Sequence, residues 1–167
     1  MSNRKLCLIS PAIGEMLVKQ LAHELKNFNL YMSFANYYAV EGYPKIEKYW
    51  RSRAQEEMRH HDWCFKYLTN ADYKFNYPVI EENKEVFSDV TAPFKLTVDR
   101  EIETTNMICK IHEAALAEKD YMTAYWVLDP LLKEQIEEEN TSRMALAIIE
   151  EDSDIYLRSK EILSLLK

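Results

Sequence analysis

Four segments of the chain each carry a glutamate where an amphipathic helix would place a core leucine. Read at alternating steps of three and four residues, each segment shows an apolar stripe, and an acid interrupts it near the middle. The four acids are Glu24, Glu57, Glu101 and Glu138. His60 follows Glu57 by three residues, so both side chains would share one helix face. This oxygen-rich ligand set suits iron or manganese better than a structural zinc ion.

Four carboxylates converging in one bundle core would be costly without a cation between them. Burial of an unpaired charge costs several kcal/mol, although a single carboxylate can escape that cost by a shifted pKa. A metal cluster is the natural compensation for four. The acidic run at 134–139 has no histidine three residues after any of its glutamates. The predicted metal site is therefore asymmetric, with one Glu-x-x-His step instead of two.

Each signal alone has an ordinary structural interpretation. A single Glu-x-x-His step is a weak indicator of metal, and the acids at 137–139 would suit a solvated face. Tyr31 is typical of a core stripe, and Cys64 of a small buried hydrophobe. The other histidines, for which we expect surface or satisfied core positions, are His23, His61 and His112. The metal interpretation rests on the conjunction, because unrelated accidents should not place an acid mid-helix in all four stripes.

The elements that must position these residues are helices. Ser10 and Pro11 form a helix start, and the Gly42–Pro44 segment breaks the first helix from the second. Residues 70–88 lack sustained periodicity and are long enough to cross a bundle from end to end. The predicted helices span about 11–38, 45–68, 89 or 91 to 118, 120–149 and 153–165. The fold class is thus all-α, a four-helix bundle with a long crossover between helices 2 and 3 and a short C-terminal fifth helix.

Composition narrows the function. The 167 residues fit one domain, and only two glycines and five prolines are too few for a multi-stranded sheet. A net charge of −7 without a basic run argues against nucleic acid, and no run of 18 apolar residues predicts a membrane span. The three cysteines, Cys7, Cys64 and Cys109, are scattered, which is typical of reduced thiols. The apolar stretch before Pro11 is too short for a signal peptide. Both observations favour the cytoplasm.

At these motifs the chain resembles the bacterial non-haem ferritins, over about residues 13–165. The motifs are Glu24 with Tyr31 seven residues later, AQEEMRHH at 54–61, REIETTNMI at 100–108 and EQIEEE at 134–139. The resemblance implies a di-iron centre without haem. One iron would be held by Glu24, Glu57 and His60, and the second by Glu57, Glu101 and Glu138, with Glu57 bridging.

Other residues receive roles from the same resemblance. A third iron site would be formed by Glu56, Glu134, Glu137 and Glu138. Tyr31 would be a redox-active tyrosine, and Gln135 would hydrogen-bond near the oxygen-binding position. Family members oxidise Fe(II) with dioxygen or hydrogen peroxide and store ferric mineral in homo-oligomeric cages of 24 subunits, with the fifth helix at the fourfold axis.

The apolar tail gives physical support to assembly. Residues 155–166 carry more apolar side chains than a short helix needs on a finished bundle, and contact with symmetry mates would bury them.

Two departures from the resemblance remain. The stretch before the fourth-helix motif is one residue longer than usual and contains Pro130, which predicts a kink or π-bulge. The family's tryptophan of that helix falls on Pro130, so its role is not transferred to Trp126.

Two alternative functions remain. A rubrerythrin-like peroxidase would normally show a second Glu-x-x-His and a cysteine cluster, whereas this chain has one such step and three scattered cysteines. A non-catalytic cage or scaffold subunit would need its buried acids paired or protonated without metal.

Overall fold

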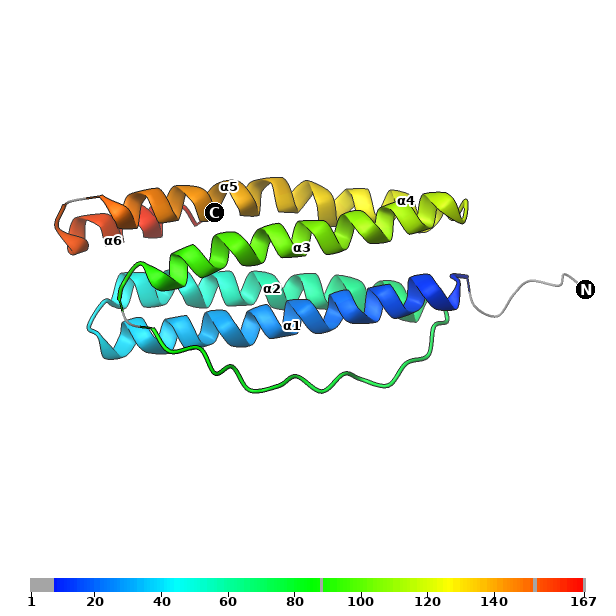
Figure 1. The fold of residues 1–167 in the computed structure, drawn as a ribbon, viewed down its shortest axis with the longest axis horizontal. Coiled ribbons are helices and arrows are strands. Elements are labelled where there is room, and N and C mark those ends of the chain that lie inside the picture. The colour runs from blue at the N-terminus through cyan, green and yellow to red at the C-terminus, as the bar shows by residue number, and fades with distance from the viewer. Residues whose placement is uncertain (1–7, 88, 152, 167) are drawn as a thin grey trace, which may run out of the picture.

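The helices lie side by side along one axis in the computed structural model, which describes residues 8–87, 89–151 and 153–166 (Figure 1). The elements are α1 (Pro11–Val40), α2 (Pro44–Asn70), α3 (Ala92–Ala117), α4 (Tyr121–Trp126), the π-helical segment η1 (Val127–Leu132), α5 (Lys133–Glu150) and α6 (Ile155–Ser164). These described ranges contain no strand. The predicted fold class is therefore confirmed, with α4, η1 and α5 together forming the fourth long helix.

The helix ends follow local capping chemistry. The Ser10 hydroxyl accepts a hydrogen bond from the Ile13 amide at 3.2 Å and starts α1. Gly42, with a φ of 83°, occupies the left-handed region in the turn to α2. The Asp120 carboxylate accepts from the Thr123 amide at 3.0 Å and starts α4. Short polar residues thus cap the starts of α1 and α4.

The fourth long helix contains the irregularity expected at Pro130. Asp129, with φ −135° and ψ 104°, leaves the helical region directly before the proline. The π-helical segment η1 spans this point, and α5 then resumes regular geometry. Because the extra residue is absorbed in η1, Gln135 and Glu138 still face the core and are buried.

The apolar core is divided into two clusters with a polar layer between them. The first cluster includes Ile13 and Leu21 of α1. The second includes Phe34 of α1 and Trp50 of α2. Between Leu21 and Phe34, the buried positions of α1 include polar side chains such as Glu24. A polar layer sealed by apolar packing at both ends is where a buried charged site would lie.

The crossover, described at 71–87 and 89–91, runs along the bundle, and α3 begins at the end at which α2 began (Figure 1). As a result, α2 and α3 run in the same direction. The crossover starts close to α1, where a Cβ atom on Gly14 would collide with the Tyr73 ring. Glycine at this position permits the close approach of the crossover to α1.

The short helix α6 begins at Ile155, two residues later than predicted, because Asp154 provides the cap. Its carboxylate accepts from the amides of Tyr156 at 2.8 Å and Leu157 at 3.3 Å. The sequence also allows Asp152 or Ser153 as the start of this helix, and Asp152 lies outside the described residues.

The apolar tail, which we expect symmetry mates to cover, is buried in part within its own subunit. α6 folds back beside α5 (Figure 1) and packs on α2 and α5. Ile162 is fully buried in the second core cluster. Tyr156 and Leu157, 58% and 54% exposed, are left on the surface. The tail thus completes its own bundle and leaves a smaller apolar surface than expected.

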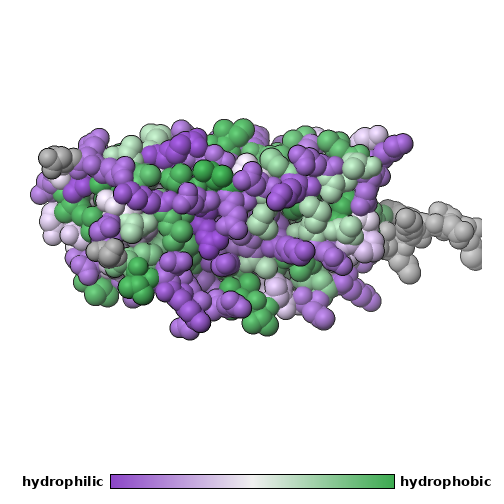
Figure 2. Space-filling model, viewed as in Figure 1, coloured by the Kyte–Doolittle hydropathy of each residue, from purple (hydrophilic) through white to green (hydrophobic). Residues whose placement is uncertain are grey.

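The outer surface is mixed. Hydrophilic and hydrophobic residues are interspersed along the face shown in Figure 2. Within the described ranges, no helix combines the length and apolar character needed to cross a bilayer.

Candidate metal centre

The carboxylates and the imidazole predicted from the stripes meet in the polar layer. Glu24 comes from α1, Glu57 and His60 from α2, Glu101 from α3 and Glu138 from α5. None of these five residues is more than 3% exposed. The structure therefore brings together from four helices the residues that the stripes singled out.

These residues form two overlapping groups of three. Glu24, Glu57 and His60 place ligand atoms within 4.8 Å of one another, and so do Glu57, Glu101 and Glu138. Glu57 belongs to both groups. Two adjacent cation positions that share one carboxylate are the geometry that such groups can provide.

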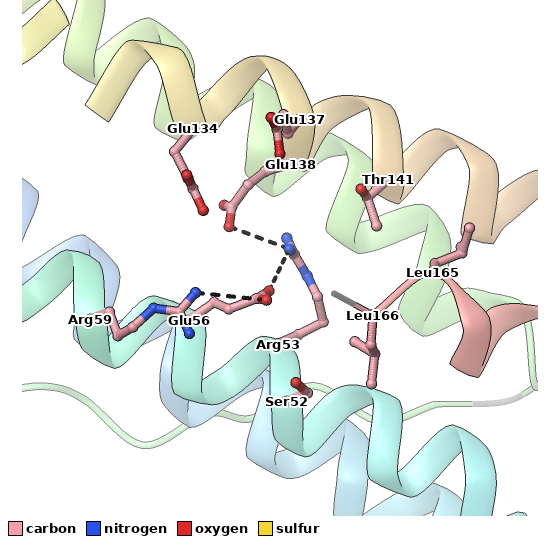
Figure 3. Close-up of a pocket in the computed structure, with 10 residues that line it drawn as sticks. All are labelled: Ser52, Arg53, Glu56, Arg59, Glu134, Glu137, Glu138, Thr141, Leu165 and Leu166. Atoms are coloured by element: carbon pink, nitrogen blue, oxygen red, sulfur yellow. Dashed lines mark hydrogen bonds and ion pairs between the residues drawn. The ribbon is translucent and has the colours of Figure 1, made fainter. Parts of the chain in front are cut away.

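The structure does not bring all the acids expected at a third iron site into one close ligand group. Glu134 joins His60 and Glu138 in another group with ligand atoms within 4.8 Å. Glu137 lines the same cavity as Glu56 and Glu134, between α2 and α5 (Figure 3).

Glu56 is held by arginines. Arg53 Nη1 donates to its Oε2 at 2.8 Å, and Arg59 Nη2 lies 3.8 Å from its Oε1. Glu56 is therefore neutralised by side chains of its own helix and forms no close ligand group with Glu134 and Glu138 in this arrangement.

Tyr31 and Gln135 both contact Glu101. The Tyr31 hydroxyl donates to Oε1 at 2.7 Å, and the Gln135 amide nitrogen donates to Oε2 at 2.9 Å. Because these donors reach both oxygens, they fix the orientation of the carboxylate.

Gln20, which sequence reasoning missed, does the same for Glu24. Its amide nitrogen donates to Glu24 Oε1 at 2.6 Å. The signal was its position one helical turn before Glu24 on the same face.

Arg53 is the second missed residue. It is 3% exposed, and its guanidinium bridges two acids, with Nη2 at 2.9 Å from Glu101 Oε1 and Nη1 at 3.3 Å from Glu138 Oε1. It stands in the stripe of the second helix, one turn before Glu57. A cation at a stripe position is as unusual as an acid, and this was the available signal.

Burial raises most carboxyl pKa values at the centre. It raises the pKa of Glu24 well above its usual range, with the nearby Glu57 charge adding to the effect. It also raises the pKa of Glu101, and that of Glu138 to about 8. Burial acts on Glu57 in the same direction, but the neighbouring His60 outweighs it and lowers the Glu57 pKa. Burial thus favours the protonated form of Glu24, Glu101 and Glu138, but not that of Glu57.

His60 is drawn toward its charged form. Burial lowers its pKa, but the carboxylates of Glu138 and Glu57 outweigh burial and raise it to about 10. A metal ion that binds this imidazole must displace a proton, so binding releases protons and weakens as the pH falls.

Several atoms aimed into the layer are buried without a hydrogen bond in the described structure. They are Glu24 Oε2, Glu57 Oε1, His60 Nε2 and Glu138 Oε2. A buried unsatisfied polar group costs about 1–3 kcal/mol, and carboxylate and imidazole atoms left in this state are competent metal ligands. The arrangement therefore offers ligand groups that can bind cations.

Comparisons with known proteins match the chain to one family. The family model of the ferritin-like domain matches residues 14–151. The bacterial non-heme ferritin of Staphylococcus aureus is 30% identical over 159 residues, which cover 93% of this chain and 95% of that protein. The bacterial non-heme ferritin of Staphylococcus epidermidis is 26% identical over the same length.

Solved structures give the same result. An open pore ferritin from the archaeon Archaeoglobus fulgidus superposes with a TM-score of 0.86 at 27% identity, covering 96% of this chain and 99% of that chain. A humanized archaeal ferritin gives a TM-score of 0.88 at 24% identity, covering 95% and 98% of the two chains, and supports the fold.

Proposed function

Since this chain belongs to the ferritin family, we propose that it oxidises Fe(II) at the buried centre and stores the ferric product. The observation that carries the proposal is the meeting of two overlapping ligand groups in a sealed polar layer. Storage of iron follows from the family. Oxidation at this centre is supported by the unsatisfied atoms of Glu24, Glu57, His60 and Glu138.

In the proposed arrangement, iron is the substrate and two ions bind side by side. Glu24, Glu57 and His60 hold the first ion, Glu57 with Glu101 and Glu138 the second, and Glu57 bridges them. A third iron would bind among the cavity acids Glu56, Glu134, Glu137 and Glu138. Because Glu56 is paired with arginines, we expect this third position to be the weakest.

The carboxylate shell favours oxidation electrostatically. Negative ligands stabilise Fe(III) more than Fe(II), which lowers the cost of removing an electron. Two Fe(II) ions give one electron each, and dioxygen takes both electrons with two protons and leaves as hydrogen peroxide. With hydrogen peroxide as the oxidant, the same two electrons and two protons give two water molecules.

Tyr31 and Gln135 have supporting roles at the second iron. Both donate to Glu101, so they set the direction of its lone pairs. Burial, reinforced by the charge of Glu101, raises the pKa of Tyr31 well above its usual range, so the phenol stays protonated. We assign Tyr31 as the redox-active tyrosine, one hydrogen bond from a ligand, and place Gln135 beside the oxidant.

Aerobic addition of Fe(II) to the metal-free protein tests the function. We expect ferric absorbance to develop faster than in buffer alone, and the iron to elute with the protein in size-exclusion chromatography. Oxidation at the rate of buffer, with no iron in the protein fractions, would favour the non-catalytic cage subunit instead.

We also propose that the protein forms a homo-oligomeric cage of 24 subunits. The support is family membership, together with the apolar surface left by Tyr156 and Leu157 on α6. Because these side chains are exposed in the subunit, changing them should not unfold the bundle.

The variant Leu157→Asp is expected to shift the sedimentation coefficient from a large particle toward smaller species, with unchanged circular dichroism. Val79→Asp, at a 93% exposed position of the crossover, is the matched control. Truncation before Ser153 should also weaken the cage, but it removes the buried Ile162 as well. A wild-type particle of one or two subunits would refute the cage, and an intact Leu157→Asp particle would remove α6 from its contacts.

We place the protein in the cytoplasm. Cys64 and Cys109 are free thiols, in keeping with a reducing compartment. Cys7 lies outside the described residues.

A further inference from the structure

We propose that Arg53 is an internal cation at the second iron position, and that it makes the two metal ions bind in order. The first ion would bind tightly at Glu24, Glu57 and His60. The second would bind more weakly, after the guanidinium moves away from Glu101 and Glu138. This inference rests on the proposed function and adds to it an unequal, regulated second position.

The contacts of Arg53 place it on the ligands of only one of the two positions. Its Nη2 lies 2.9 Å from Glu101 Oε1 and its Nη1 lies 3.3 Å from Glu138 Oε1. A guanidinium that bridges two carboxylates occupies the directions from which a divalent ion would bind both. In the described part of the chain, no lysine or arginine forms an ion pair with Glu24 or Glu57.

The charge of Arg53 is permanent. Guanidinium cannot be deprotonated in proteins, so a metal ion cannot remove this competitor by displacing a proton. Competition with this fixed charge therefore acts on the second position, whose ligands Glu101 and Glu138 are the ones that Arg53 contacts.

A destination for the displaced guanidinium is already present. Arg53 lines a cavity of about 150 Å³ between α2 and α5, with Glu56 and Glu134 also on its walls (Figure 3). Arg53 Nη1 donates to Glu56 Oε2 at 2.8 Å, and the Glu56 side chain is 18% exposed toward solvent. By turning toward Glu56, Arg53 would keep one ion pair while releasing Glu101 and Glu138.

The same movement would operate in reverse when the second ion leaves. Glu101 and Glu138 would regain the guanidinium as a partner and avoid the cost of an unpaired buried charge. Arg53 therefore stabilises the half-loaded centre, in which only the first ion is bound.

The test is a titration of the metal-free protein with Zn²⁺, which binds carboxylate and imidazole ligands but undergoes no redox chemistry. By calorimetry, we expect two classes of buried site whose Kd values differ by at least about tenfold. Glu24→Gln should weaken the tight class, and Glu101→Gln the weak one. Arg53→Gln should tighten the weak class by at least about tenfold and leave the tight class within about twofold.

Arg59→Gln is the matched control. Arg59 also lies against Glu56, at 3.8 Å, but it is 55% exposed and makes no ion pair with Glu101 or Glu138. Its zinc affinities should equal those of the wild type. If Arg53→Gln does not fold, Arg53→Met replaces it, because methionine has a long flexible side chain without a charge, and the weak class should still tighten.

The possible outcomes separate the two proposals. If the wild type binds zinc at both positions with equal affinity, the role of Arg53 is overturned and the proposed function still stands. The same holds if substitution of Arg53 leaves the affinity of the weak class unchanged. No tight zinc binding that depends on Glu24 would overturn the metal centre itself, and the inference with it.

Discussion

Glu57→Gln is expected to reduce the initial rate of Fe(II) oxidation by at least about 100-fold. The substitution keeps the shape of the side chain and removes the charge shared by both ligand groups, so both iron positions lose a ligand at once. Every other ligand of the first position is absent from the second, and variants there should retain more activity. Stopped-flow absorbance after mixing the metal-free protein with Fe(II) and oxygen measures the effect.

Glu103→Gln is the control for this prediction. Glu103 lies on α3, its side chain is 53% exposed, and it pairs with Arg100 at 2.7 Å. Like Glu57→Gln, Glu103→Gln removes one negative charge, so any general effect of net charge on the attraction of iron appears in both variants. Equal rates for Glu57→Gln and Glu103→Gln would mean that iron is oxidised elsewhere.

Trp50→Ala is expected to lower the free energy of unfolding by about 3–5 kcal/mol. The Trp50 side chain is fully buried, with its ring centroid 4.8 Å from those of Phe34 and Phe94 and 5.0 Å from that of Tyr49. Removing the ring opens a cavity that links three helices. Trp50 lies one helical turn before Arg53, so its removal should also loosen the packing next to the polar layer.

Chemical denaturation of the metal-free protein, followed by circular dichroism, measures this change. Trp50→Phe keeps an aromatic ring and should recover part of the loss. Tyr121→Ala, at a position 67% exposed, should change the free energy of unfolding by no more than about 0.5 kcal/mol. If Trp50→Ala lowers the free energy of unfolding by less than about 1 kcal/mol, the stability of the second core cluster does not depend on Trp50.

Much of the centre was predictable because helix periodicity is local. A residue on an apolar stripe must face the core if the helix is to pack, so Glu24, Glu57, Glu101 and Glu138 could be placed together before any fold was known. Pro130 was equally informative, because a proline cannot continue regular α-helical hydrogen bonding. Each of these predictions depends only on the sequence within a single helix, and not on contacts between helices.

The contacts of long side chains were not predictable in the same way. Arg53 and Gln20 stood at positions that face the core, yet their partners depend on rotamers and on the approach of other helices. The pairing of Glu56 with Arg53 competes with its expected place among the cavity acids for the same reason. The docking of Ile162 depends on a tertiary surface of α2 and α5, which the tail sequence does not contain.

Crystals soaked anaerobically with Fe(II), with anomalous diffraction recorded at the iron absorption edge, test most directly whether iron binds in the polar layer. We expect a strong peak among Glu24, Glu57 and His60, and a weaker one between Glu57, Glu101 and Glu138 with Arg53 turned toward Glu56. Iron peaks confined to surface carboxylates, with none inside the bundle, would contradict oxidation at this centre.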